Sequence, residues 1–215
     1  MRDLVFNDVL FLLQGLKWTI ILSLIALAGG GLVGLVIALA RVSASRILRG
    51  LTICYIAVLQ GTPLLLQLFV VYFGLALLNF SIGAWVAVAI GLTLNAGAFL
   101  GDIWRGGIEA VPGGQSQAAN ALGLRYVSRM RDVILPQAFR VVLPATVGFM
   151  VQIIKGTSLA AIIGFTELSR SGQLVANATF RPLLMFGVVG AMYFALCYPL
   201  SALSVRLERR LAVSR

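Results

Sequence analysis

The sequence predicts an all-α membrane protein with five transmembrane helices, and two observations lead to that prediction. Of its 215 residues, 60% are hydrophobic and only 11% are charged, with a mean hydropathy of +1.00. Soluble domains carry about 25% charged residues, so this chain has too few charges to cover a soluble surface. Uncharged stretches also recur at lengths that cross a bilayer, which takes roughly 20 residues of helix. We therefore expect residues 1–215 to form a single transmembrane domain.

The first predicted span covers about residues 18–40, where no charged residue occurs. Gly30 and Gly34 lie within it, at a spacing that lets a second helix approach closely. The preceding residues, 1–17, are mildly amphipathic and are expected to lie at the membrane surface.

The charge-free stretch 51–101 is too long for one helix and suits two. A turn-like segment at 79–83 divides it into spans at about 56–78 and 83–103. The Gly-Thr-Pro segment at 61–63 should disturb the earlier span, because proline removes a backbone donor. Such a break within a membrane must face protein or a wet cavity.

Charges return in the longest polar connection of the chain, 105–140. Within it, 115–122 is an alanine-rich helix candidate, and Gly123 stands where a glycine commonly ends a helix. A second helix is predicted at 125–135. The remaining two spans follow at about 145–165 and 183–205.

Basic residues orient these spans. Twelve arginines lie in the connection after the first span, in the 105–140 connection and in the C-terminal tail, against four basic residues on the opposite side. Basic residues concentrate in cytoplasmic loops. The sequence therefore predicts that the 105–140 connection and the C-terminus are cytoplasmic and that the N-terminus is outside. This rule also explains the net charge of +10 better than nucleic-acid binding does.

The residue types exclude several kinds of catalytic site. The chain has no histidine, which rules out His-based metal sites and Ser-His or Cys-His pairs. Cys54 and Cys197 lie in apolar sequence, which favours free thiols over a disulfide. A phosphate-binding loop ends in Gly-Lys-Ser/Thr, but neither Lys17 nor Lys155 follows a glycine. We predict no catalytic residue and no metal ligand, and a separate subunit must bind any ATP that drives the protein.

The 105–140 connection carries the most specific motif. Residues 114–123 read Gly-Gln-Ser-Gln-Ala-Ala-Asn-Ala-Leu-Gly, and Leu135-Pro136 follow. This pattern resembles the coupling-loop signature of the inner-membrane permease subunits of bacterial ABC importers. Other motifs resemble the polar amino-acid branch of that family (histidine, arginine, glutamine or glutamate type): Gly61-Thr62-Pro63-Leu64, Asn95 with Gly97-Ala98-Phe99, and Ile154-Lys155-Gly156-Thr157-Ser158.

The resemblance implies the type I permease fold of ABC importers and a division of work among subunits. This chain would be a non-catalytic permease that moves a polar amino acid across the bacterial inner membrane by alternating access. Two ATP-binding subunits would hold ATP and Mg, and this chain would bind no cofactor. The other expected partners are a second permease chain, identical or related, a periplasmic or extracellular substrate-binding protein, and membrane lipid, but no nucleic acid.

The resemblance also places the contact with the ATPase in the 105–140 connection, where small side chains let a helix sit deep in a partner's groove. Gln117 replaces the glutamate that is common in the family, so its charge is lost. The residue pattern alone leaves open an amphipathic helix that rests on the lipid surface. The expected coupling residues are Gln117, Ala118, Ala119, Gly123, Asp102 and Arg105.

Polar side chains within the spans are candidates for the substrate pathway. A charge at mid-membrane costs about 2.5–3.5 kcal/mol, so Lys155 is interpreted as a pathway charge or as half of an ion pair. Gln67 and Asn95 fit substrate contact or interhelical hydrogen bonds, and hydroxyls can bond their own helix. Glu167 fits a gate near the outer face, a contact with the binding protein or a solvated turn. The expected pathway residues are Thr62, Gln67, Asn95, Lys155, Thr157, Ser158 and Glu167.

A gradient-driven secondary transporter or channel is the alternative class. Lys155 and Asn95 within spans would suit it, but it does not explain the alanine-rich connection. Gln60 and Gly156 also depart from residues that are common in the family, so the resemblance does not name the amino acid.

Overall fold

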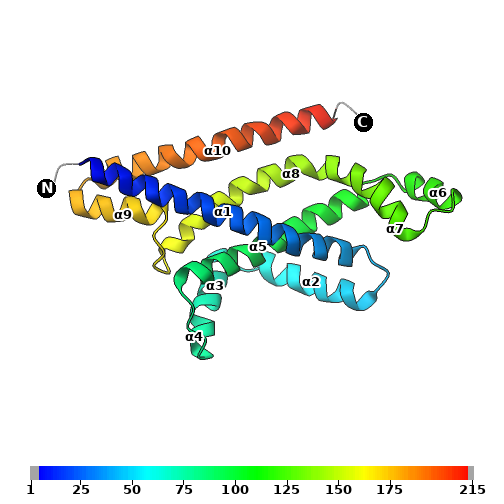
Figure 1. The fold of residues 1–215 in the computed structure, drawn as a ribbon, viewed down its shortest axis with the longest axis horizontal. Helices are drawn as coiled ribbons and strands as arrows, with labels where there is room; N and C mark the ends of the chain where they lie inside the picture. The colour runs from blue at the N-terminus through cyan, green and yellow to red at the C-terminus, as the bar shows by residue number, and fades with distance from the viewer. Residues whose placement is uncertain (1–4, 213–215) are drawn as a thin grey trace.

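The computed structural model describes residues 5–212, and all regular structure in that range is helical. The longer helices form an elongated bundle (Figure 1). Four helical stretches are long and apolar enough to cross a membrane, and a bent pair makes a fifth when it is counted as one span. The predicted all-α class is confirmed. The elements are α1 Phe6–Arg41, α2 Arg46–Gln60, α3 Leu64–Phe69, η1 Val70–Gly74, α4 Leu75–Leu77, α5 Ala84–Glu109, α6 Gly113–Ala121, α7 Tyr126–Ser128, η2 Arg129–Ile134, α8 Leu135–Gly156, η3 Thr157–Ala161, α9 Leu168–Thr179 and α10 Pro182–Ala212.

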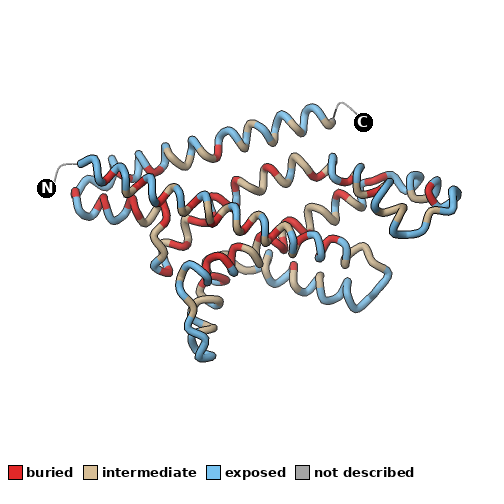
Figure 2. Tube along the Cα trace, viewed as in Figure 1, coloured by how far each residue is buried: buried red, intermediate tan, exposed pale blue. Residues whose placement is uncertain are grey.

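The contact between α1 and α5 forms the centre of the bundle. A Cβ atom built on Gly30 would lie 2.5 Å from the Cβ of Ala96, and one built on Gly34 would lie 3.0 Å from the backbone nitrogen of Gly101. Larger residues would push the helices apart, which confirms the close approach predicted for this glycine pair. Figure 2 shows buried stretches along the middle of the molecule. The core cluster there comprises Leu22, Ala26, Ala87, Val88, Leu92, Ala96, Ile153, Ala160 and Ile163.

The first helix is longer than the predicted span. α1 is continuous from Phe6 to Arg41, so residues 6–17 do not form a separate surface segment. Leu12 is buried in a cluster with residues of α9 and α10, which supplies partners that lie far away in the sequence. At 1.5 Å per residue, a helix of 36 residues is about 54 Å long and exceeds the hydrocarbon core of about 30 Å.

The second predicted span, 56–78, is broken. α2 ends at Gln60, α3 begins at Leu64, and the two parts are bent by 105°. Pro63 has no backbone N–H and cannot continue the helical hydrogen bonds of α2. The arm formed by α3, η1 and α4 therefore turns away from the long axis of the bundle (Figure 1).

The helix predicted at 125–135 is not separate from the fourth span. α7, η2, α8 and η3 form one helical stretch, Tyr126–Ala161, which begins well before the predicted 145–165. Pro136 stands at the start of α8, directly after the π-helical turn η2, where a missing N–H is tolerated. Pro144 lies inside α8, and its carbonyl accepts a 2.8 Å hydrogen bond from Ser204 Oγ of α10.

Candidate functional site

The polar connection folds into a short helix that projects beyond the bundle. α6 and α7 lie at the end of the molecule opposite the start of α1 (Figure 1). Gly123 follows α6, as predicted for a glycine that ends a helix, and its φ of 72° is the left-handed conformation that such a glycine adopts. Its N–H donates to the carbonyl of Asn120 at 2.9 Å, and the N–H of Leu124 donates to Ala119 at 3.1 Å. These two bonds are the Schellman arrangement, which fixes the end of the helix.

The predicted coupling residues on α6 differ in exposure. Gln117 and Ala118 are exposed, whereas Ala119 is only 4% exposed. Because α6 packs on η2 of the same connection, the expectation that Ala119 lies open to a partner is corrected: it belongs to the packing of the connection itself. Among the alanines predicted to contact the ATPase, Ala118 is the one at the surface.

Polar side chains hold α6 against the following helical turns. Arg129 donates a hydrogen bond to Asn120 Oδ1, and its guanidinium lies 5.4 Å from the centroid of the Tyr126 ring. Gln137 Nε2 donates to Gln115 Oε1 at 3.4 Å. No local sequence pattern indicates these pairs, because their pairing depends on how the connection folds back.

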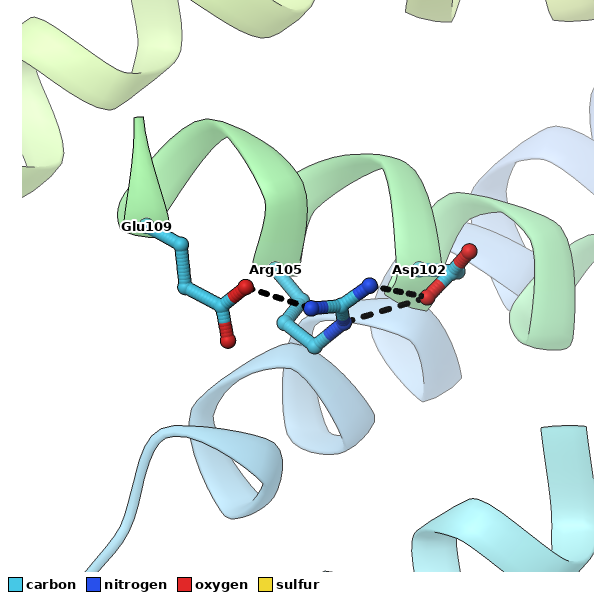
Figure 3. Close-up of polar contacts among 3 residues, drawn as sticks. All are labelled: Asp102, Arg105 and Glu109. Atoms are coloured by element: carbon cyan, nitrogen blue, oxygen red, sulfur yellow. Dashed lines mark hydrogen bonds and ion pairs between the residues drawn. The ribbon is translucent and has the colours of Figure 1, made fainter. Parts of the chain in front are cut away.

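Asp102 and Arg105 pair with each other and not with residues of α6. On α5, Nε and Nη2 of Arg105 donate to Asp102 Oδ1 at 3.1 and 2.9 Å, and Nη1 bonds Glu109 (Figure 3). The spacing of three and four residues places these side chains on one face of the helix. Within residues 5–212, no hydrogen bond or ion pair links either predicted residue to α6. Glu109 was missed by the prediction, although its spacing from Arg105 indicated it.

Three predicted pathway residues meet at the bend between α2 and α3. Gln67 Nε2 donates to the carbonyl of Leu59 at 2.7 Å and to the carbonyl and hydroxyl oxygens of Thr62, both at 3.0 Å. Asn95 Nδ2, from α5, donates to Gln67 Oε1 at 3.0 Å. The buried Gln67 thus satisfies carbonyls that the break leaves unbonded at the end of α2. The structure matches the interhelical interpretation of Gln67 and Asn95.

The end of α8 holds three further pathway candidates. Lys155 is exposed on the surface of this chain. No carboxylate of the described residues forms an ion pair with it, so the ion-pair interpretation finds no partner there. Thr157 Oγ1 donates to the carbonyl of Ile154 and Ser158 Oγ to that of Lys155, each at 2.7 Å. Both hydroxyls therefore bond their own helix, as expected.

Glu167 is fully buried and does not lie in a solvated turn. The polar residues that follow it form α9, and its carboxylate caps that helix. Oε2 accepts from the N–H of Ser169 and Oε1 from the N–H of Arg170, both at 2.9 Å. The interpretation as a solvated turn is corrected, because the carboxylate supplies acceptors that the first turn of a helix lacks.

The carboxylate of Glu167 also reaches two other helices. Oε2 accepts from Tyr193 Oη of α10 at 2.8 Å and from Thr19 Oγ1 of α1 at 3.4 Å. Burial raises the pKa of the Glu167 carboxyl above its ordinary value, and the hydrogen bonds that it accepts oppose this rise. α1, α9 and α10 are thus joined at a single side chain. Tyr193 was missed because nothing in the local sequence pairs it with a residue 26 positions earlier.

Comparisons with known proteins agree with this architecture. Residues 30–213 match the family described as "Binding-protein-dependent transport system inner membrane component". The probable amino-acid ABC transporter permease protein YckA of Bacillus subtilis strain 168 is 34% identical over 202 residues, which are 94% of this chain and 89% of that protein. The arginine transport system permease protein ArtQ of the same strain is 35% identical over 202 residues, which are 94% of this chain and 92% of that protein.

A further relative and two solved structures extend the comparison. The glutamine transport system permease protein GlnP of Escherichia coli K12 is 35% identical over 204 residues, 94% of this chain and 93% of that protein. The crystal structure of an amino acid ABC transporter with histidines superposes with a TM-score of 0.87 at 33% identity, over 97% of this chain and 100% of that one. An inward-facing structure of the MetNI methionine ABC transporter gives a TM-score of 0.82 at 18% identity, over 97% of this chain and 99% of that one, which shows a shared fold.

Proposed function

Because this chain belongs to the family of binding-protein-dependent transport system inner membrane components, we propose that it is the permease subunit through which an ATP-driven importer moves a polar amino acid. The observation that carries the proposal is α6: a helix with an exposed small-residue surface, closed by a left-handed glycine, that projects from the bundle. The names of relatives that transport arginine or glutamine support a polar amino acid as cargo.

The chemistry of ATP belongs to other subunits in this proposal. Two ATP-binding subunits hold ATP and Mg, a second permease chain completes the pathway, and a substrate-binding protein delivers the amino acid from outside. The exposed Gln117 and Ala118 meet a groove on one ATPase. Since α6 packs on η2, and η2 continues into α8, a displacement of α6 moves the helical stretch up to Ala161. Alternating access follows if the inward-open and outward-open states of the transporter differ in their affinity for the amino acid or for ATP.

Lys155 is the predicted pathway residue that we place on the route of the substrate. It lies on the surface of this chain without a carboxylate partner among the described residues. An unpaired charge within a membrane is tolerated only where it faces water or other protein. The ammonium group would therefore face a wet pathway and bind the carboxylate of an amino acid. Gln67, Asn95 and Thr62 act instead as the support of the bend.

The protein is a multi-pass permease of the inner membrane. Its orientation in our proposal has the N-terminus outside and the C-terminus, together with α6, in the cytoplasm. This orientation rests on the twelve arginines that flank one side of the spans. It also places α6 on the side of the membrane where ATP is available.

Reconstituted transport tests the proposal. The permease, its ATPase and its binding protein are placed in proteoliposomes, and the uptake of radiolabelled arginine, glutamine, histidine and glutamate is measured with and without internal ATP. We expect uptake that requires both ATP and the binding protein. Uptake that follows an imposed ion or substrate gradient without ATP would instead identify a secondary transporter or channel.

A further inference from the structure

A hollow between α1 and α2 is not used in the proposed import. It has a volume of about 540 Å³ and is lined by Val33, Val36 and Ile37 of α1 and by Leu51 and Tyr55 of α2, among others. The hydroxyl of Tyr55 is engaged, because it donates to the carbonyl of Leu94 at 2.7 Å. The Tyr55 ring therefore contributes an apolar surface, and almost the whole lining of this groove is hydrocarbon.

One end of the groove is basic. α1 ends at Arg41, one helical turn beyond Ile37, and α2 begins at Arg46, with Arg49 close before Leu51. The two helices run in opposite directions and are joined by a short loop (Figure 1), so these three arginines lie at the same end. Residues 41–55 contain no aspartate or glutamate. Arg46 and Arg49 are exposed, and Arg41 Nε is buried with no hydrogen-bond partner among the described residues.

We propose that this groove binds an anionic phospholipid, whose acyl chain lies on the α1–α2 surface and whose phosphate meets Arg41, Arg46 and Arg49. Charge complementarity decides the occupant: a neutral lipid or an apolar helix would cover the hydrocarbon but leave the arginines without a counter-charge. Anionic lipids are abundant in the cytoplasmic leaflet. The arginines lie on that side in the orientation proposed above, on which this inference rests. The excess of basic residues in cytoplasmic loops explains why arginines lie beside a span. It does not explain why an apolar groove ends at these arginines.

A groove-filling variant tests the acyl-chain part. Val36→Trp fills the groove, whereas Leu24→Trp adds the same side chain to a residue of α1 outside the groove. The two residues are matched, since they are 68% and 58% exposed. The intact transporter is purified from vesicles of phosphatidylglycerol and phosphatidylcholine, and retained lipid is identified by native mass spectrometry. We expect retained phosphatidylglycerol in the unmodified protein and in Leu24→Trp, and its loss in Val36→Trp.

A charge variant tests the headgroup part. R46Q combined with R49Q should weaken phosphatidylglycerol retention about thirtyfold, from the usual contribution of each basic residue near an anionic surface. R125Q combined with R131Q removes the same charge from exposed positions of the cytoplasmic connection and should leave retention unchanged. Native mass spectrometry reads lipid binding without transport, so failure here is distinguishable from failure of the proposed function.

Two outcomes would overturn the inference. One is equal retention of phosphatidylglycerol and phosphatidylcholine, or equal retention by Val36→Trp and Leu24→Trp. The other is separation of the two permease chains by Val36→Trp, which would assign the groove to a second copy of this chain.

Discussion

Tyr193 donates a 2.8 Å hydrogen bond to Glu167, and this bond joins α10 to the cap of α9. Thr19 of α1 bonds the same carboxylate oxygen, and Ser169 Oγ lies 3.1 Å from the Tyr193 hydroxyl. A buried polar group that loses its hydrogen-bond partner destabilises the folded protein. The carboxylate therefore fixes the relative positions of three helices.

Removal of the Tyr193 hydroxyl should destabilise this junction. We expect Tyr193→Phe to lower the free energy of unfolding by about 1.5–3 kcal/mol, the usual range for a hydrogen bond to a charged group. Thermal unfolding in detergent measures the change. Tyr198→Phe is the control, because Tyr198 is exposed and its ring stacks on Phe194. An equal effect of the two substitutions would contradict the role assigned to the Tyr193 hydroxyl.

The pH dependence of stability should report Glu167. Burial raises the pKa of its carboxyl above the ordinary value of 4.5, so the folded protein binds this proton more tightly than the unfolded chain does. The contribution to stability is therefore complete below the ordinary pKa and decreases as the pH rises through the raised pKa. Glu167→Gln should flatten the pH dependence of the unfolding temperature above pH 4.5. Parallel curves for the two proteins would show that Glu167 does not titrate in this window.

The bend between α2 and α3 should depend on the Gln67 amide. Gln67→Leu leaves the carbonyls of Leu59 and Thr62 without their donor, and each such buried group costs about 1–3 kcal/mol. Asn95→Leu removes only the bond to Gln67 Oε1. In a double-mutant cycle by thermal unfolding, we expect a coupling of at least about 0.5 kcal/mol. Additive effects would mean that the two side chains act independently.

Lys155 should matter for transport more than for stability. Lys155→Met keeps much of the side-chain length and removes the charge. We expect the initial rate of uptake to fall at least about tenfold, which equals about 1.4 kcal/mol in the barrier, while the complex still assembles. Lys17→Met is the matched control, since Lys17 is the other lysine of the chain and is also exposed. Unchanged uptake with a higher unfolding temperature would identify Lys155 as a tolerated structural charge.

Features that depend on local chemistry were predictable from the sequence. The left-handed Gly123, the close approach at Gly30 and Gly34 and the disturbance at Pro63 each follow from what one residue type permits at its own position. The 105° bend was not predictable in size, because it also depends on Gln67 and on Asn95 of another helix.

Features that depend on distant partners were not predictable. Glu167 lies in a polar stretch of sequence, yet it is buried because Thr19 and Tyr193 supply hydrogen bonds from 148 and 26 positions away. Ala118 and Ala119 are equivalent by composition, and only the packing of α6 on η2 distinguishes the exposed residue from the buried one. The sequence pattern predicts a helix of small residues at α6, but it does not predict which face of α6 is exposed.

In the proposed mechanism, α6 couples ATP hydrolysis to transport through its exposed face. The most direct test compares ATP-dependent uptake by Ala118→Trp and Val127→Trp in proteoliposomes that contain the ATPase and the binding protein. Both residues are exposed in the same connection, but only Ala118 lies on α6. We predict that Ala118→Trp inserts normally and loses uptake together with ATP hydrolysis stimulated by the binding protein, whereas Val127→Trp retains both. Normal uptake by Ala118→Trp at normal expression would contradict the claim and favour a helix that rests on the lipid surface.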